Sequence, residues 1–560
     1  MIKNLIKGVA TLVLALLLAS CKIGTSSNYK NSNNNEGSSS SSNNEQSTAK
    51  NEQPSYSYKG LQFYYKELSP DQYRLEQLSD EDFNALPKDK KLKVANNLLN
   101  SLFFGYPLKD LERRVNSGNF ISNIRDSLTK NQINRDAIEN HIRDEEYFTL
   151  YANNPWTQPQ VTTILTRFYA MDKLDRYYFE NWEAYILTQT IMFSPAYELT
   201  STSTPDISRV YNRLVNMLDI DSGMRYITYV HMMSEDNWRR FRSPEDNGRE
   251  MLEIFTLDAN DSHVPLAGKA LQNWKLNRDS DTLEVTLNKN HTPIKLFNTT
   301  LYTGEDFYRE LVKSKEFTYG VTKRLVDFFF PNKSKSRKAI IIDKIVSSKP
   351  QKWEDILKQI LFSKEYLLNN KRALSAEERF FSFTKKMNFK VAKREIYVFK
   401  VRLNEMHQAA MKYKLGKLNR VPLDTLSFAV YNKYIRERIL LNWSYPDETN
   451  RDSWKYDGWG DLFINTDNFV LNEDNQEQSL KNYINYLFKS TIGRGAKEAE
   501  YKLFISHMME NGELKNEFNL VIRENSNEEK DRRERRINIA RVILDYISRL
   551  EETYTQSEVE

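Results

Sequence analysis

The sequence predicts a mainly α-helical protein, a multi-helix globular body with a small β-hairpin that follows a disordered N-terminal tether. Apolar residues recur at spacings of three and four over most of the chain after residue 56. Only 17 glycines and 15 prolines interrupt 560 residues. We expect three parts after the tether: residues 57–332, a second helical portion 333–475, and charged helices over 476–560.

The first twenty residues have the pattern of a secretory signal that ends in a lipoprotein box. Lys3 and Lys7 precede an apolar run that ends at Leu18, and Leu18-Ala19-Ser20-Cys21 follows. The run is shorter than the about 20 residues that a membrane-spanning helix needs. We therefore expect cleavage before Cys21, acylation of that cysteine, and a mature protein held to the membrane by lipid.

Residues 21–56 are rich in Ser, Asn, Glu and Gln, so they cannot bury enough apolar area to fold. A flexible coil of this length reaches roughly 30 to 35 Å, which lets the body stand clear of the membrane. Cys21 is the only cysteine, which excludes a disulfide-linked partner, a cysteine metal site and a thiol nucleophile. The net charge of +5 becomes +3 (5 minus 2) without the two signal lysines and does not call for nucleic acid.

Several segments have the periodicity of amphipathic helices. The apolar stripes are Leu92, Ala95, Leu99 and Leu102; Leu174, Tyr178, Trp182 and Tyr185; Phe307, Leu311, Val321, Leu325 and Phe328; and Trp353, Ile356, Leu357, Ile360 and Leu361. Such stripes favour helices that bury one face. A last stripe from Ile537 to Leu550 predicts a terminal helix docked on the body, in preference to a coiled coil with too few heptads.

One segment has the alternation of a strand. Leu283, Val285 and Leu287 alternate with polar residues, and residues 277–280 (Asn-Arg-Asp-Ser) provide a turn after Trp274. These residues predict a β-hairpin. The triple 340–342 (Ile-Ile-Ile) is ambiguous, because β-branched runs favour strands whereas its flanks are helical in pattern.

The chain lacks the sequence motifs of the common enzyme classes: a zinc-binding His-Glu-x-x-His, a Gly-x-Ser-x-Gly elbow and a phosphate-binding glycine loop. The densest polar constellation is residues 243–258, where a helix is expected to begin near Asn247. On that helix Glu250 and Glu253 are three residues apart, and Arg249 lies four residues before Glu253. If this face were buried, Arg249 would be the partner of its carboxylates.

Residues 248–257 (GREMLEIFTL) resemble the most recognisable motif of the bacterial family called domain of unknown function 1800. Residues 98–107 (LLNSLFFGYP) resemble the family's opening helix and Phe-Gly turn, and residues 267–274 (AGKALQNW) its segment before the hairpin. The resemblance continues in the same order along the chain at His291 and at residues 304–306, 323–329, 458–460 and 463–466.

The resemblance, over about residues 90–475, implies a mostly helical fold and an exported protein, without assigning a reaction. Members are thought to work beside a second secreted family of sulfatase-like fold. The chain departs from the family pattern: of the residues that precede the Arg-Glu step only Glu245 is kept, Asp258 replaces a glycine, and Thr292 follows His291. The lipid signal, the tether and the Lys/Asn-rich body together resemble spirochaete-type surface lipoproteins.

Two interpretations of the constellation stay open. The constellation forms either a charged network that fixes a helix start against the hairpin, or a catalytic site. Its members are Glu245, Arg249, Glu250, Glu253 and His291. In the catalytic interpretation one carboxylate accepts a proton, His291 donates one or binds metal, and Trp274 walls the pocket.

Two further groups are weaker candidates. Trp454 and Trp459 belong either to a sugar-stacking loop or to an aromatic packing corner. His231 and Glu235 are interpreted as a solvated helix pair rather than as metal ligands. We predict no cofactor and no metal.

The expected function is that of a lipid-anchored envelope protein at the cell surface of the outer membrane, which interacts with other proteins. The alternatives are an envelope hydrolase, or hydrolase accessory, that acts on glycan or peptide, and a periplasmic assembly factor.

Overall fold

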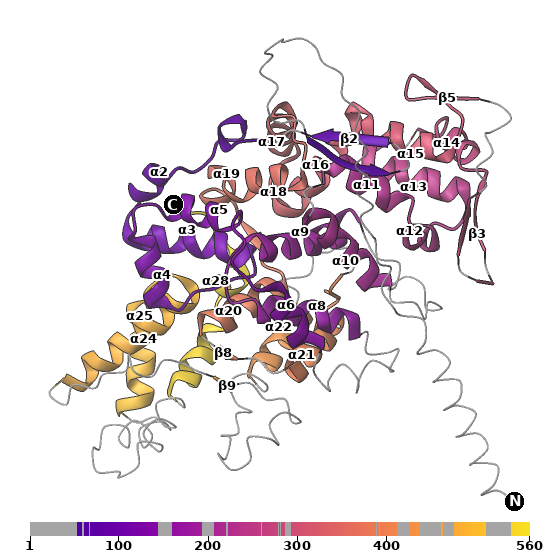
Figure 1. Ribbon diagram of the computed structural model, residues 1–560. Helices are drawn as coiled ribbons and strands as arrows, with labels where there is room; N and C mark the ends of the chain where they lie inside the picture. Colours follow the sequence, from indigo (N-terminus) through magenta and orange to yellow (C-terminus); the bar gives the residue numbers. More distant parts are fainter. Residues whose placement is uncertain are drawn as a thin grey trace, which may run out of the picture. The chain divides into compact units, whose positions relative to one another are not determined.

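Helices make up most of the described chain, as the sequence predicts (Figure 1). The structure is a computed structural model. It describes residues 53–58, 61–65, 68–143, 159–192, 206–219, 222–258, 260–277, 279–280, 282–285, 293–387, 389–390, 393–411, 425–436, 461–462, 475–510 and 539–559. The signal, Cys21 and the tether up to residue 52 lie outside these ranges, whereas residues 53–56 of the expected tether belong to a strand.

The helices of the first half are short and follow one another closely. They are a 3-10 turn at Pro70–Gln72, α2 (Asp80–Asn84), α3 (Lys88–Ser101), α4 (Leu108–Val115), α5 (Phe120–Ser127), α6 (Arg135–Arg143), α8 (Pro159–Ala170), α9 (Arg176–Thr190), α10 (Asp206–Asp219), α11 (Met224–Met232), α12 (Glu235–Arg240), α13 (Pro244–Thr256) and α14 (Val264–Ala270).

The second half continues in the same style. Its helices are α15 (Gly304–Lys313), α16 (Lys315–Phe329), α17 (Lys335–Ser347), α18 (Trp353–Leu361), α19 (Lys364–Leu367), α20 (Ala376–Lys386), α21 (Lys393–Glu405), α22 (Thr425–Tyr434), α24 (Gln476–Ile492), α25 (Glu498–Ile505), a π-turn at Ser506–Glu510 and α28 (Glu551–Tyr554). Residues 539–547 are helical as well.

The described residues contain five two-stranded antiparallel sheets, which do not combine into a layer. They pair β1 (Gln53–Tyr58) with β2 (Leu61–Tyr65), β3 (Trp274–Leu276) with β4 (Leu283–Val285), β5 (Ile294–Leu296) with β6 (Thr299–Leu301), β7 (Arg372–Ala373) with β10 (Thr555–Gln556), and β8 (Phe389–Lys390) with β9 (Asp461–Leu462). A two-stranded sheet is marginal alone, and helices α12, α14, α15, α20 and α28 pack against β3, β5, β6, β8 and β10, respectively.

The predicted hairpin is confirmed as far as Val285, and Leu287 lies outside the described residues. Leu276 pairs with Leu283, and the Asn277 side-chain oxygen accepts hydrogen bonds from the backbone N–H groups of Asp279 and Ser280 at 2.9 and 3.2 Å. The β5–β6 hairpin was not predicted. Its turn residues Phe297 and Asn298 both have positive φ (55° and 57°), as the tightest hairpin turns require.

The predicted stripes form the core. The stripe from Leu92 to Leu102, in α3 and its C-cap, is fully buried at all four positions, and so are the five stripe residues of α18. Phe328 of α16 is only partly buried. Burial of each leucine or isoleucine side chain among the fully buried stripe residues stabilises the fold by about 1.5 to 3 kcal/mol. The ambiguous isoleucine triple lies within α17, where Ile341 and Ile342 are buried and Ile340 is 45% exposed.

Polar N-cap side chains explain where many helices begin. Asp175, Ser234, Thr303, Ser363 and Ser375 each accept a hydrogen bond from a backbone N–H of the first turn of α9, α12, α15, α19 and α20. Such caps satisfy donors that have no partner within the helix. The caps are local sequence signals, so these starts are encoded close to where they occur.

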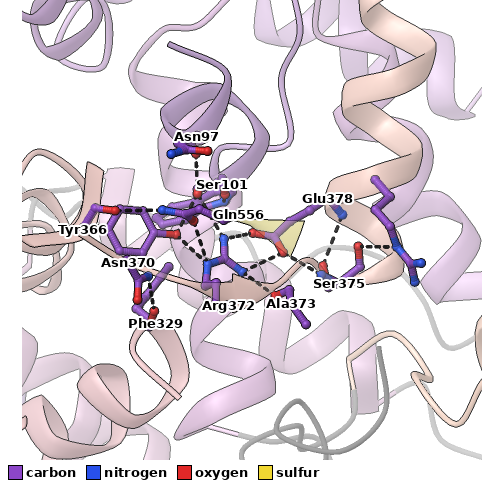
Figure 2. A network of polar contacts seen from close by, with 12 residues as sticks. Asn97, Ser101, Phe329, Tyr366, Asn370, Arg372, Ala373, Ser375, Glu378 and Gln556 are labelled. Atoms are coloured by element: carbon purple, nitrogen blue, oxygen red, sulfur yellow. Dashed lines mark hydrogen bonds and ion pairs between the residues drawn. The ribbon is translucent and has the colours of Figure 1, made fainter. Parts of the chain in front are cut away.

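The C-terminal residues are bound into the body by a buried polar network (Figure 2). The Arg372 guanidinium donates to both carboxylate oxygens of Glu378, and its Nε donates to Tyr366 and to Gln556, both at 3.0 Å. Ser101 of α3 accepts from the same guanidinium at 3.1 Å. The network therefore joins segments from both ends and from the middle of the sequence.

Residues 52–560 form one compact unit. The expected boundary at 332 falls in the turn between α16 and α17, and the one at 475 falls at the N-cap of α24. The terminal helix docks as predicted: Ala540, Ile543 and Leu544 are fully buried, and Tyr546 contacts Phe504 edge-on with ring centroids 5.3 Å apart.

Candidate functional site

The motif helix α13 begins at Pro244, three residues before the predicted start. The Ser243 side chain accepts a hydrogen bond from the Asp246 backbone N–H at 3.1 Å. Proline at the first helical position costs no hydrogen bond, because a backbone N–H at that position would have no partner within the helix. The sequence-based start near Asn247 was therefore wrong. The Asn247 side chain is fully buried and accepts a hydrogen bond from the Tyr308 hydroxyl at 2.7 Å.

The small residues of the motif permit close helix packing. A Cβ on Gly248 would lie 2.8 Å from Cβ of Ala267, and one on Gly268 would lie 3.0 Å from Cα of Glu245. The first contact is shorter than real Cβ atoms show and the second is tighter than most, so the close approach of α13 and α14 depends on glycine at these positions. This part of the motif serves packing.

The other end of α13 is held by α16. Arg324 donates from Nε to the carbonyl oxygen of Ile254 at 2.7 Å and from Nη2 to that of Glu253 at 2.8 Å. A Cβ on Gly320 would lie 2.3 Å from the Phe255 carbonyl oxygen. The basic side chain therefore caps the helix end, where carbonyl groups lack intrahelical partners.

The charged residues of the motif lie at the surface. Arg249 is 48% exposed, with Nη2 at 2.7 Å from Asp246 Oδ1 and 3.8 Å from Glu250 Oε1. Glu245 is exposed, and Glu250 and Glu253 are half-buried. Burial, with the Glu253 and Asp246 carboxylates beside it, raises the pKa of Glu250 above its ordinary value. The structure brings Arg249, Glu250 and Asp246 into one surface network.

Trp274, proposed as a pocket wall, is buried in an aromatic stack. Its ring is parallel to that of Trp238 at 5.8 Å and meets the Tyr308 ring edge-on at 5.5 Å. A Cβ on Gly304 would lie 2.4 Å from Trp274 Nε1, so α15 also packs directly on this ring. His291, Trp454 and Trp459 lie outside the described residues.

The interpretation of His231 and Glu235 as a solvated helix pair was wrong. His231 lies in α11 and is 3% exposed, whereas Glu235 begins α12 and pairs with Arg239 at 3.1 Å. Burial lowers the pKa of His231 to about 3, so the imidazole is neutral. The intervening Ser234 N-cap separates the two helices, which places the two side chains in different environments.

A polar pocket of about 50 Å³, which sequence reasoning missed, lies between α9 and the start of α18. Arg176, Glu180 and Glu183 line it from α9, and Lys352 and Glu354 line it from the start of α18. The remaining lining residues are Leu128 and Thr129 after α5, Phe179 of α9, Leu218 of α10, Ser222 before α11, and Trp353 of α18.

Most charged groups of this pocket are paired. Glu180 accepts from Arg176 Nε at 2.8 Å and lies 3.4 Å from Arg135. The Glu354 carboxylate contacts Lys358 and lies 3.6 Å from Lys352. Burial raises the pKa of Glu180 to about 7, whereas the neighbouring lysines hold the pKa of Glu354 below its ordinary value despite its burial.

Glu183 is the exception among these carboxylates. It is 3% exposed, and its Oε1 has no hydrogen-bond partner within the described part of the chain. Burial, with the Glu354 carboxylate next, raises its pKa well above the ordinary value. Ser222 and Trp353 also line this pocket, and their donor atoms Oγ and Nε1 likewise find no partner among the described residues.

A sequence signal for this pocket existed but was weak. Glu180 and Glu183 flank Trp182 in α9, whose described residues from Tyr177 to Thr190 are all buried. A carboxylate inside an all-round buried helix is unusual and marks a site worth inspection. Its partners on α18 lie more than 160 positions further on, and no local pattern links the two helices.

The described ranges contain neither a metal-binding cluster nor a membrane-spanning helix. No group of three or more His, Cys, Asp or Glu side chains there is arranged to hold a metal ion. None of the helices in those ranges combines the length and the apolar character that a membrane crossing requires.

Comparison with family models, with curated proteins and with solved structures gives no match to this chain. The resemblance to the domain of unknown function 1800 family therefore rests on the quoted motifs and stays a prediction.

Proposed function

We propose that this protein is a lipid-anchored protein of the cell envelope whose helical body interacts with other proteins at the cell surface. The observation that carries the proposal is the sequence Leu18-Ala19-Ser20-Cys21 after a short apolar run, with Cys21 as the only cysteine. Acyl chains on Cys21 provide the membrane attachment, and residues 22–52 provide reach.

The geometry of the motif helix is consistent with a non-catalytic role. Its buried positions serve packing against α14, α15 and α16, and its charged side chains Arg249 and Glu250 form an open surface network. A general acid or base is more often enclosed in a cleft whose walls tune its pKa. The motif is therefore better explained as a packing device than as an active site.

Metabolic labelling with radioactive palmitate tests the anchor. Wild-type protein should incorporate label and partition into the detergent phase of a Triton X-114 extract, whereas Cys21→Ser should do neither. Ser40→Ala in the tether is the matched control and should behave as wild type. Failure of the wild-type chain to incorporate palmitate contradicts the proposal.

Cross-linking on intact cells tests the interaction role. A defined set of cross-linked proteins, lost when Cys21→Ser releases the chain from the membrane, is the expected result. Protease treatment of whole cells separates a surface protein, which is digested, from a periplasmic assembly factor, which survives. A survey that finds no cross-linked protein counts against the interaction role.

The hydrolase alternative depends on Glu250 and His291. Activity profiling of the full chain against glycan and peptide substrates, repeated with Glu250→Gln and His291→Ala, tests it directly. Loss of a hydrolytic activity in both variants would favour the enzyme, and unchanged behaviour in both removes it.

A further inference from the structure

We propose that the pocket between α9 and α18 binds the ammonium group of a small amine that also carries an oxygen acceptor, with Glu183 as the carboxylate that receives the ammonium. Three polar atoms on residues that line this pocket lack hydrogen-bond partners within the described ranges: Glu183 Oε1, Ser222 Oγ and Trp353 Nε1. All three residues are at most 3% exposed. A buried polar group without a partner costs about 1 to 3 kcal/mol.

The charges of the pocket select the ligand. Glu180 is compensated by Arg176 and Arg135, and Glu354 by Lys352 and Lys358. Glu183 has no ion-pair partner among the residues described. A ligand ammonium is therefore the group that can contact ionised Glu183 directly, and it converts a buried carboxylate without an ion-pair partner into an ion pair.

The two unpaired donors set the second requirement. The Trp353 indole N–H only donates, and the Ser222 hydroxyl can donate or accept, so an oxygen acceptor on the ligand satisfies one or both. A simple metal cation has no such acceptor, whereas an amino alcohol or an amino acid has both functions. The shared chemistry is a primary ammonium with a nearby hydroxyl or carboxylate oxygen.

The size and access of the pocket restrict the ligand to a few heavy atoms. A volume of about 50 Å³ accepts about three or four water-sized groups. Access is through the partly exposed rim, where Arg176 is 31% and Glu354 is 22% exposed, beside exposed Thr129. Ethanolamine and glycine have the right functions and approximate size, and they differ in whether the acceptor is a hydroxyl or a carboxylate.

Binding should depend on pH because Glu183 must lose a proton. The groups that face it are Glu180 and Arg176 on its own helix and Glu354 and Lys358 on α18, and the carboxylates disfavour ionisation while the cations favour it. A ligand ammonium adds a cation and displaces the proton. The affinity should therefore rise with pH as Glu183 loses its proton, up to the pH at which the primary amine loses its own proton.

Equilibrium dialysis of the full-length protein in detergent tests the proposal with four radiolabelled probes. Ethanolamine or glycine should bind saturably and more tightly than methylammonium, which lacks the acceptor, and acetate, which lacks the ammonium, should not bind. Tighter binding of ethanolamine identifies a hydroxyl acceptor, and tighter binding of glycine a carboxylate. The proposal is overturned if acetate binds as well as the amines, or if none of the probes binds and ordered water alone fills the pocket.

Variants separate the pocket from the rest of the protein. Glu183→Gln keeps the shape and should weaken binding at least about tenfold, because a charge-assisted contact is lost. Ser222→Ala should weaken it about two- to tenfold without changing charge. Glu365→Gln is the control, since it removes an ion-paired carboxylate of similar burial from α19. Equal affinity of Glu183→Gln and wild type, with both folded by circular dichroism, overturns the proposal independently of whether Cys21 is acylated.

Discussion

Glu378→Leu tests whether the buried network of Figure 2 fastens the C-terminus to the body. The side chains of Arg372 and Glu378 are 4% and 6% exposed, so the substitution leaves a buried guanidinium without its counter-charge. Arg372 loses two charge-assisted hydrogen bonds, and the Ser375 backbone N–H loses the oxygen that it contacts at 2.7 Å. The hydrogen bonds from Arg372 to Tyr366 and Gln556 remain.

The expected cost follows from these losses. Each charge-assisted bond contributes about 1.5 to 3 kcal/mol, and removal of one partner of a buried pair costs about 3 to 5 kcal/mol. We expect the free energy of unfolding to fall by about 4 kcal/mol, measured from the urea midpoint followed by circular dichroism. The double variant Arg372→Met with Glu378→Leu should recover much of this loss, since no unpaired charge is left.

An exposed pair provides the matched control. Arg402 donates to both oxygens of Glu405 at 2.7 and 2.6 Å, but the two side chains are 36% and 43% exposed. Glu405→Leu should cost less than about 1 kcal/mol because water screens and replaces the pair. A loss below about 1 kcal/mol for Glu378→Leu, or a double variant as unstable as the single one, would refute the reasoning.

Two further predictions concern a buried lysine and a close helix contact. Burial lowers the pKa of Lys386 to about 7. Above that pH the unfolded chain binds more protons than the folded chain, so the free energy of unfolding rises from about pH 7 to about pH 10. Lys386→Met should flatten this rise by about 1.4 kcal/mol per pH unit in urea titrations, whereas Lys344→Met should not. Gly320→Ala places a Cβ against the carbonyl of Phe255 and should cost about 1 to 3 kcal/mol. The exposed neighbour Tyr319→Ala should cost far less, and equal thermal midpoints for the two would contradict the packing argument.

Local patterns in the sequence were sufficient for much of the fold. The stripe from Leu92 to Leu102 and the alternation around Leu283 depend only on neighbours along the chain, because helix and strand periods are local properties. The turn at Asn277 was also predictable from neighbouring residues alone. The start of α13 was predicted three residues too late, although Ser243 followed by Pro244 is a local signal for a helix start.

The candidate site was less predictable. The sequence pointed to Glu250, whose carboxylate lies in a surface network, and passed over Glu183, which is buried without an ion-pair partner in the described ranges.

The sequence by itself determined the helical class, the hairpin, the terminal helix and the expectation of acylation at Cys21. Only the tertiary structure decided which polar side chains are buried and which distant residues they contact. Glu354 lies beside α9, and Arg372 donates a hydrogen bond to Gln556. These two contacts join residues more than 100 positions apart, and a periodicity of two or 3.6 residues contains no information about such distant partners.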